Sequence, residues 1–351
     1  MMTLRLFTGK FESVPAATAW YLAELGEARG KQELFTRQSP QKLKVLREHA
    51  LIESAISSNR IEGVEVDKSR VATLMFGKPT LRDRDEEEVR GYRDALRLIH
   101  EQGAKLPITE ATIKKLHKLC RGEIWDAGVY KEKDMDIIQT YADGRSRVRF
   151  KTVPAKQTLK AMTEMVELWQ RGLMEKWIHP LALVAALNLD FLCIHPFRDG
   201  NGRVSRLLFL LACYHCGLEV GRYISLERIV EESKETYYEV LLKSSNDWHE
   251  PKHNLSPWWE YFLGTIIAAY KEFEERVGTI TTARGAKREM VQQAIKRMHG
   301  RFRFGELQKA CPGISYPTLK RALMDLKRQK KIRCLGKGRD AEWERIGSWS
   351  D

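Results

Sequence analysis

The sequence has no long apolar run, few cysteines and no low-complexity tract. Its most apolar stretch, residues 181–194, is interrupted by Asn188 and Asp190, whereas a membrane span needs about 20 apolar residues. The first residues lack the apolar core of a secretory signal. Six cysteines scattered among 351 residues are typical of reduced intracellular thiols and not of a disulfide framework. We therefore expect a cytoplasmic protein that does not enter a membrane.

The charge is distributed unevenly along the chain. Lys and Arg number 60 against 47 Asp and Glu, a formal net charge of +13. Residues 285–351 hold 17 of the basic residues and 7 of the acidic ones. Such a basic segment on a nearly neutral body predicts a separate module with a polyanionic partner. A solvated, lysine-rich surface is the alternative.

Most of the chain has apolar residues at helical spacing. Two segments, 181–192 and 204–216, are apolar nearly all round, which predicts two buried central helices. One segment differs, because an Asp143–Gly144 pair between alternating residues over 135–153 predicts a β-hairpin. A lone hairpin is marginally stable, so it must lean on the helical body and is a suitable place for a substrate to dock. The other predicted helices cover residues 48–61, 85–100, 109–119, 156–169, 237–243 and 258–277.

The C-terminal segment has its own pattern. Residues 278–286 are predicted as a linker, followed by helices over 288–298, 304–310 and 315–330 and two strands over 331–343. This order predicts a winged helix-turn-helix. The side chains predicted to contact DNA are Ser315, Tyr316, Thr318, Lys320 and Arg321 on the third helix, with Lys337 and Arg339 on the wing.

The candidate chemistry lies between the two central helices, in residues 195–206 with the sequence HPFRDGNGRVSR. Gly200 and Gly202 leave backbone amides exposed at a helix N-terminus, which suits phosphate. Arg203 and Arg206 are three residues apart, so both are expected to project from one face beside this anion site. Three further side chains complete the predicted phosphoryl- or nucleotidyl-transfer site: Asp199 as a Mg²⁺ ligand, Asn201 as an amide donor to phosphate and His195 as the base.

These twelve residues resemble the signature of the Fic family, His-Pro-Phe-x-(Asp or Glu)-Gly-Asn-Gly-Arg-x-x-Arg, at every specified position. The resemblance implies a Fic-type helical bundle with a β-hairpin flap. It also implies transfer of AMP from ATP to a Ser, Thr or Tyr hydroxyl, with His195 as the general base and Mg²⁺ on Asp199. The residues it implies for ATP and phosphate binding are Gly200, Asn201, Gly202, Arg203, Val204, Ser205 and Arg206, with Tyr237, Tyr238 and Asn246 on the adenine side.

Within this resemblance, Arg203 would bind the β-phosphate and Arg206 would orient the γ-phosphate. The target's side chain would dock on a flap made by Asp134, Met135, Asp136, Ile137 and Ile138.

An upstream segment, SNRIEG over residues 58–63, resembles the inhibitory pattern (Ser or Thr)-x-x-x-Glu-(Gly or Asn) of the same family. Ser58 and Glu62 are four residues apart and share a helix face. The resemblance implies that Glu62 pairs with Arg206 and blocks the seating of the γ-phosphate. An ordinary exposed Glu near a helix end is the alternative.

Together these patterns predict a mainly α protein in four parts. An N-terminal helical region with the inhibitory helix covers 1–95, a catalytic core 96–277, a linker 278–286 and a winged helix 287–351. The predicted function is an autoinhibited protein adenylyltransferase that modifies a target protein or itself. A bifunctional or deAMPylating enzyme and an ATP-sensing, DNA-binding regulator are the alternatives, and self-association of the inhibited form is a further expectation.

Overall fold

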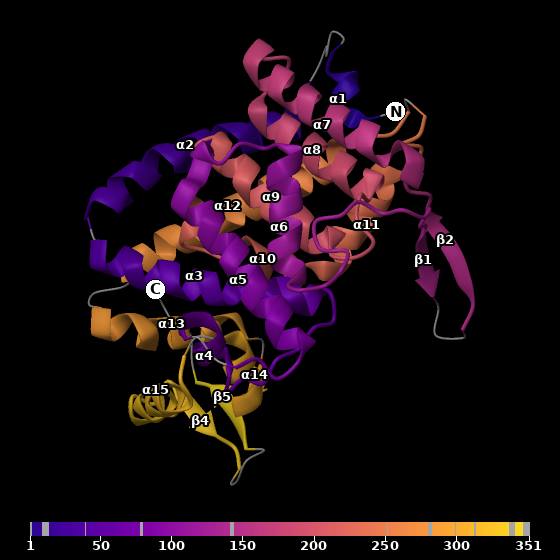
Figure 1. Ribbon diagram of the computed structural model, residues 1–351. Coiled ribbons are helices and arrows are strands. Elements are labelled where there is room, and N and C mark those ends of the chain that lie inside the picture. The colour runs from indigo at the N-terminus through magenta and orange to yellow at the C-terminus, as the bar shows by residue number, and fades with distance from the viewer. Residues whose placement is uncertain are drawn as a thin grey trace.

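The computed structural model describes residues 2–8, 14–38, 40–77, 80–140, 144–250, 252–279, 283–298, 300–311, 314–336 and 341–346. A helical body is followed by a small C-terminal unit that packs beneath it (Figure 1). The elements of the body are α1 Thr3–Leu6, α2 Ala16–Gln38, α3 Pro40–Ile61, α4 Val71–Phe76, α5 Arg84–Gln102, η1 Gly103–Lys105, α6 Glu110–Arg121, β1 Ile137–Thr140, β2 Ser146–Phe150, α7 Ala155–Glu175, α8 Pro180–Ile194, α9 Asn201–His215, η2 Val220–Arg222, α10 Leu226–Glu232, α11 Lys234–Ser245 and α12 Ser256–Thr279.

Two apolar helices form the centre of the body. Every residue of α8 from Leu181 to Ile194 is buried, and α9 packs along it with Val204, Leu207 and Leu208 fully buried. Their nearly uniform apolar sequence leaves no face that water could solvate, so other helices must surround them on all sides. This arrangement holds the loop between α8 and α9 at one end of a rigid helix pair.

Polar side chains cap the N-termini of two surrounding helices and fix where each helix begins. The Asp83 side chain accepts from the Glu86 amide at 2.9 Å at the start of α5, and Thr109 accepts from the Thr112 amide at 3.2 Å at the start of α6. Each satisfies an amide that would otherwise lack a partner. The body then presents α3, α5 and α6 to α9, which is where the site residues gather.

The mainly α fold class predicted from the sequence is confirmed, and strands β1 and β2 pair antiparallel as the predicted hairpin. Part of the predicted turn, Ala142 and Asp143, lies outside the described residues. The hairpin projects from one side of the body (Figure 1). Its outer side chains Ile138 and Val148 are exposed. Of the helices in the described ranges, none is long and apolar enough to cross a membrane.

The C-terminal unit comprises three helices and a three-stranded antiparallel sheet of order β3-β5-β4. It sits against α3 and α12 of the body, where Arg297 Nη1 donates to Glu272 Oε1 at 3.0 Å and Cys311 is buried. Its elements are α13 Ala283–Arg297, β3 Arg301–Arg303, α14 Phe304–Ala310, α15 Tyr316–Arg328, β4 Ile332–Cys334 and β5 Glu342–Arg345.

Several predicted boundaries are wrong. The linker predicted over 278–286 is helical at both ends, because α12 runs to Thr279 and α13 begins at Ala283. The domain boundary predicted after residue 95 falls inside α5, which packs on α3, α6 and α9 and therefore belongs to one continuous body. The sequence analysis did not predict helices α1, α2, α4 and α10 or strand β3. Helix α2 has little amphipathic periodicity and β3 is only three residues long, so neither has a strong sequence pattern.

Candidate active site

Two residues of the loop between α8 and α9, His195 and Gly200, have a left-handed backbone conformation. His195 has φ 51° and ψ 61° and ends α8, with its amide still donating to Phe191 O at 2.9 Å. Gly200 has φ 79° and precedes Asn201, the first residue of α9. A residue with φ in the left-handed region turns the chain sharply, and glycine does so at the least cost. The start of α9 has no side-chain cap, and uncapped first-turn amides are groups that can bind an anion.

The interior of this loop is held by Asn201 and Phe197. The Asn201 side chain accepts from the Phe197 amide at 3.0 Å and donates to the Phe197 carbonyl at 2.8 Å. It is buried, as is the Phe197 ring. One N–H of the Asn201 amide therefore closes the loop, and donation to a phosphate oxygen by this side chain stays a prediction.

His117 of α6 supports the same loop and was not singled out from the sequence. Its ring stacks on Phe197 with centroids 3.7 Å apart, its Nε2 donates to the Asp199 carbonyl at 2.9 Å, and its Nδ1 accepts from the Gly128 amide at 2.8 Å. These bonds assign a neutral tautomer. Burial lowers the pKa of His117 to about 4. A lone His on an amphipathic helix gives no sequence signal for this role.

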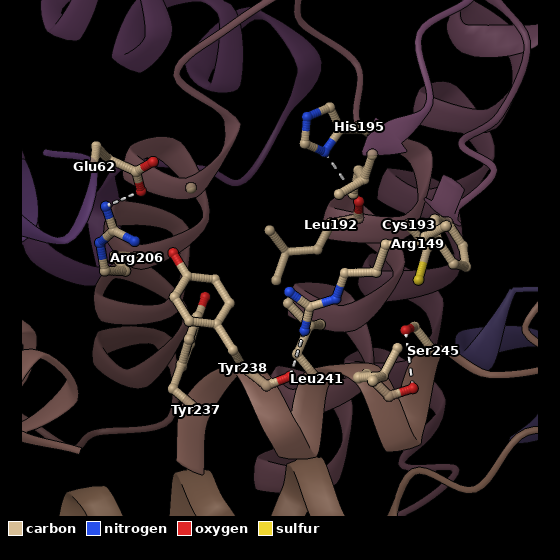
Figure 2. A pocket seen from close by; sticks show the side chains of 14 residues that line it. Glu62, Arg149, Leu192, Cys193, His195, Arg206, Tyr237, Tyr238, Leu241 and Ser245 are labelled. Carbon is tan, nitrogen blue, oxygen red and sulfur yellow. Dashed lines mark hydrogen bonds and ion pairs between the residues drawn. The ribbon is translucent and has the colours of Figure 1, made fainter. Parts of the chain in front are cut away.

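A cavity of about 240 Å³ opens beside the loop (Figure 2). His195 lies at one side of it, and the Glu62–Arg206 ion pair lies at the opposite side. Gly202, at the start of α9, lines the cavity between them. Residues from four segments that are far apart in sequence thus share one small space. The rest of the lining comes from the hairpin, the end of α8 and α11: Ile137, Arg149, Phe150, Leu192, Cys193, Tyr237, Tyr238, Leu241, Leu242 and Ser245.

His195 is poised as a neutral imidazole. Burial first, and then the positive charge of Lys131, lower its pKa to about 4. Lys131 is itself buried, with Nζ donating to Thr152 Oγ1 at 2.7 Å and to the Ile194 carbonyl at 3.1 Å. Burial lowers the pKa of Lys131 to about 8. At neutral pH the His195 ring can therefore accept a proton.

Arg206 is held by the segment that ends α3. Its Nη2 donates to Glu62 Oε1 at 2.7 Å and to the Ser58 carbonyl at 3.0 Å, and its Nε donates to Ser58 Oγ at 2.9 Å. A Cβ on Gly202 would stand 2.3 Å from Glu62 Oε1. Only glycine at position 202 allows this carboxylate so close to the start of α9. The contact expected between Glu62 and Arg206 is present.

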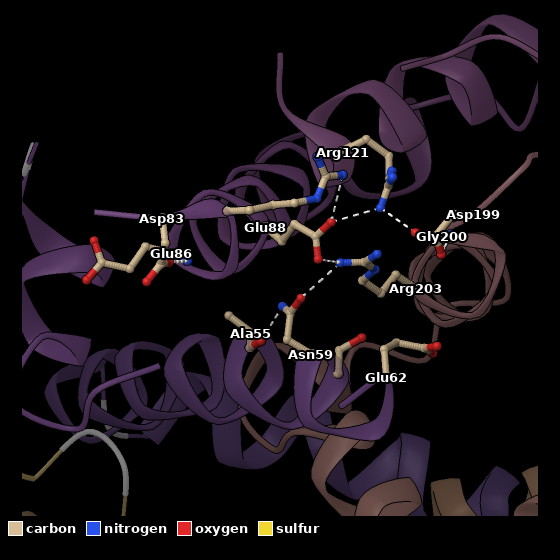
Figure 3. Close-up of polar contacts among 12 residues, drawn as sticks. Ala55, Asn59, Glu62, Asp83, Glu86, Glu88, Arg121, Asp199, Gly200 and Arg203 are labelled. Carbon is tan, nitrogen blue, oxygen red and sulfur yellow. Dashed lines mark hydrogen bonds and ion pairs between the residues drawn. The ribbon is translucent and has the colours of Figure 1, made fainter. Parts of the chain in front are cut away.

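Arg203 points elsewhere, toward α5 and α3 (Figure 3). Its Nη1 donates to Glu88 Oε2 and, at 3.3 Å, to Asn59 Oδ1. Glu88 also accepts from Arg121 Nη1 at 2.8 Å. Arg203 and Arg206 therefore have different carboxylate partners, Glu88 and Glu62, and phosphate binding by both arginines stays a prediction. The network of Glu88, Arg121 and Asn59 was not identified from the sequence.

Asp199 is the predicted Mg²⁺ ligand, and its side chain is 60% exposed. Its Oδ2 accepts from Arg121 at 2.6 Å and its Oδ1 accepts from the Gly200 amide at 2.6 Å. Burial opposes ionisation, but Arg121 and this amide lower the pKa of Asp199 below its ordinary value. Within the described ranges, no three His, Cys, Asp or Glu side chains are grouped to hold a metal by themselves. One exposed carboxylate fits Mg²⁺ only if phosphate oxygens and water supply the other ligands.

Comparison with known proteins agrees with this geometry. A family model described as "Fic/DOC family" matches residues 107–213, which run from α6 through the loop to α9. Residues 107–213 form a Fic/DOC family domain. A "Protein adenylyltransferase Fic" of Drosophila grimshawi is 26% identical over 145 residues, which are 41% of this chain and 26% of that protein. A Fido domain-containing protein of Dictyostelium discoideum is 31% identical over 105 residues, 28% of this chain and 61% of that protein.

The fold extends beyond the matched domain. A solved Fic family protein from Desulfovibrio desulfuricans superimposes with a TM-score of 0.62 at 22% identity, covering 97% of this chain and 98% of that one. The C-terminal unit is therefore part of a shared fold. The chain spans about a quarter of the length of the Drosophila protein it matches, 26%.

The remaining residues predicted for the site divide into those that line the cavity and those that do not. Tyr237 and Tyr238 line the cavity, as does Ile137 of the hairpin. In contrast, Val204 and Ser205 are buried within α9, and Ser205 Oγ donates to the Gly202 carbonyl at 2.8 Å. Asn246 is exposed and does not line the cavity. These last three positions do not face the cavity. The other predicted flap residues, Asp134, Met135, Asp136 and Ile138, precede or begin β1 outside the cavity.

Arg149 is a cavity residue that sequence reasoning missed. It comes from β2, and its Nη2 donates to the Tyr238 carbonyl at 2.8 Å while its guanidinium lies 5.6 Å from the Tyr238 ring centroid. The hairpin is thereby tied to α11 across the cavity (Figure 2). An arginine in a short alternating strand carries no sequence signal for this contact.

Of the residues predicted for DNA binding, Tyr316 and Lys320 line a hollow that Lys68 of the body also borders. Ser315, Tyr316, Lys320 and Arg321 are exposed at the start of α15, and Thr318 is half-buried. Lys337 and Arg339 lie outside the described residues.

Proposed function

We propose that the chain is a protein adenylyltransferase, which transfers AMP from ATP to a Ser, Thr or Tyr hydroxyl of a target protein or of itself. The observation that carries this proposal is that a neutral His195, the uncapped start of α9 and Arg206 border one cavity whose other wall is tyrosine and leucine. That cavity offers a base, an anion site and an apolar surface for a nucleobase in one place. The Drosophila grimshawi relative of the domain is named for the same activity.

The chemistry assigned to each residue follows from its placement. Neutral His195 accepts the proton of the target hydroxyl, whose oxygen attacks the α-phosphorus while pyrophosphate leaves. The first-turn amides of α9 stabilise charge on the phosphate oxygens. His117 and Asn201 hold the loop through the contacts described above, so they position His195 without contacting ATP. Asp199 would hold Mg²⁺, which when bound would neutralise phosphate charge.

We further propose that the contact of Glu62 with Arg206 is inhibitory. The Nε and Nη2 groups of Arg206 already donate to Ser58 and Glu62, and the Glu62 carboxylate offsets its positive charge, so Arg206 is less available to a γ-phosphate. The cavity of about 240 Å³ is also smaller than the roughly 300–1,000 Å³ of most ligand sites. Displacement of Glu62 would free both the guanidinium and the space.

The mass of the intact protein after incubation with ATP and Mg²⁺ tests the reaction class. We expect the Glu62→Gly variant to gain the mass of one or more AMP groups, and the same variant with His195→Ala to gain none. A gain of the mass of a phosphate group alone would contradict the proposed transfer of AMP. So would an unchanged mass of both the Glu62→Gly variant and every protein in a panel of candidate targets.

A second candidate function is DNA binding by the C-terminal unit. The three helices and the antiparallel sheet support the winged-helix proposal, and α15 exposes Lys320, Arg321 and Lys327. Binding of duplex DNA by the full chain should weaken steeply as salt rises. A gel-shift titration at low and moderate salt tests this, and no shift at low salt would favour recruitment of a protein instead.

A further inference from the structure

A second cavity, of about 410 Å³, lies behind the turn that carries Glu62. Its walls come from the end of α3, the segment that follows it, the start of α11, and α14 of the C-terminal unit. The cavity is therefore formed jointly by the body and the C-terminal unit. Nothing in the reaction proposed above uses it.

Positive charge predominates in this cavity. Its charged lining consists of Arg60, Lys68, Lys234 and Lys309, against Glu65 and Glu231. Glu231 already accepts from Arg60 at 3.4 Å. Lys68 and Lys309 make no ion pair with any residue in the described part of the chain. The lining thus has more cations than its carboxylates neutralise.

The cations also influence one another. Burial first, and then the positive charges of Lys309 and Arg60, lower the pKa of Lys68. Lys68 belongs to the body and Lys309 to α14, so like charges from the two parts of the molecule meet at this junction. An anion between them would relieve this repulsion and would link the two parts.

The rest of the lining is mostly apolar, and consists of Ile56, Val64, Val66, Val71, Val89 and Ile314. A cavity lined by both cations and aliphatic side chains matches an organic molecule that carries phosphate groups. Its volume of about 410 Å³ lies within the usual range for such sites.

We propose that this cavity is a binding site for a small phosphorylated molecule, held by Lys68 of the body and Lys309 of α14. Nucleic acid also supplies phosphate, but the aliphatic part of the lining offers nothing to a solvated duplex backbone. The small molecule is therefore the better match, and duplex DNA is an outcome of the test.

The position of the site gives it a consequence that rests on the proposed function. Lys234 Nζ donates to the Ile61 carbonyl at 2.8 Å, one residue before Glu62. This bond satisfies a carbonyl at the end of α3. A phosphate group that draws Lys234 into the cavity would weaken that bond and loosen the turn that holds Glu62 on Arg206.

Calorimetry with inorganic tripolyphosphate and the full chain tests the site. The variant carries Lys68→Gln and Lys309→Gln. The matched control carries Lys156→Gln and Lys160→Gln, the same loss of charge at exposed positions of α7. Tripolyphosphate that binds at the active site contributes equally to the isotherms of the variant and the control. We expect the first variant to lose one tripolyphosphate site, or to bind there about tenfold more weakly or worse, while the control keeps it.

Backbone amide exchange of residues 58–66 provides a second readout. Tripolyphosphate should speed exchange there in the control, and should do so less in the Lys68→Gln, Lys309→Gln variant. Neither measurement depends on AMP transfer, so failure of this site is distinguishable from failure of the proposed function. An isotherm for that variant identical to the wild type would overturn the proposal. The assignment to a small molecule would also be overturned if the Lys68→Gln, Lys309→Gln variant lost duplex DNA binding but kept its tripolyphosphate binding unchanged.

Discussion

The two sides of α9 each pair an arginine with a carboxylate, but the two pairs differ in burial. Toward α5, Arg203 meets Glu88, with side-chain exposures of 3% and 5%. Toward the end of α3, Arg206 meets Glu62, with exposures of 5% and 30%. Glu88 accepts from three guanidinium groups, those of Arg84, Arg121 and Arg203. Arg206, in contrast, has Ser58 as a second partner. Two arginines three positions apart therefore make contacts of different kinds: the pair of Arg203 with Glu88 is buried, whereas the carboxylate partner of Arg206 is partly exposed to solvent.

Removal of Glu88 should cause the largest loss of stability. The Glu88→Ala change leaves Arg203 and Arg121 buried without their shared carboxylate, which costs about 3–5 kcal/mol in the free energy of unfolding. Urea denaturation of the full chain measures this. Glu101→Ala, on the exposed end of the same helix, is the matched control and should change stability little. Equal stability of the two variants would show that the Glu88 network is not structural.

Removal of His195 should abolish transfer while leaving the phosphate contacts in place. Loss of a general base lowers the rate by about 10²–10⁴-fold, so His195→Ala in the Glu62→Gly background should show that decrease with labelled ATP. Calorimetric ATP binding in the same variant is the control and should be retained. Turnover equal to that of the parent would rule out His195 as the base.

Removal of Glu62 should raise transfer and leave the fold intact, in contrast to Glu88. Arg206 keeps its two bonds to Ser58 in Glu62→Gly, so it is not left unpaired. A regulatory coupling of about 1–3 kcal/mol predicts roughly a 5- to 150-fold increase in auto-modification. Glu65→Gly, in the same turn but without the Arg206 contact, is the control. Lower transfer by Glu62→Gly, together with loss of AMP removal, would favour the deAMPylating alternative.

The smallest expected effect concerns the pH profile. A neutral His195 is needed, so activity falls as the pH drops through its pKa of about 4. Lys131→Met removes a positive charge that lowers this pKa, so the pKa rises and the acidic limb moves to higher pH, by up to about 1 unit. Lys133→Met, two residues away and exposed, should leave the limb in place. A limb that moves to lower pH, or equally in both variants, would contradict the role of Lys131.

Local sequence determined the elements that carry the site. The apolar patterns of α8 and α9 and the left-handed turn at Gly200 follow from residues within a short stretch. The Glu62–Arg206 contact could also be anticipated, because each partner belongs to a recognisable motif. Backbone conformation and helical periodicity are local properties, so a sequence shows them directly.

Only the tertiary structure decided which polar groups meet. Arg203 was expected beside the anion site and is bound to Glu88, Asn201 was expected on phosphate and closes its own loop, and the linker predicted before the C-terminal unit is mostly helix. His117, Lys131 and Arg149 reach the site from α6, the loop after it and β2. A charged or polar side chain takes the partner that compensates its burial best, and that partner comes from a segment distant in sequence. The sequence could therefore specify a loop, two helices and their apolar faces, whereas packing selected the contacts around them.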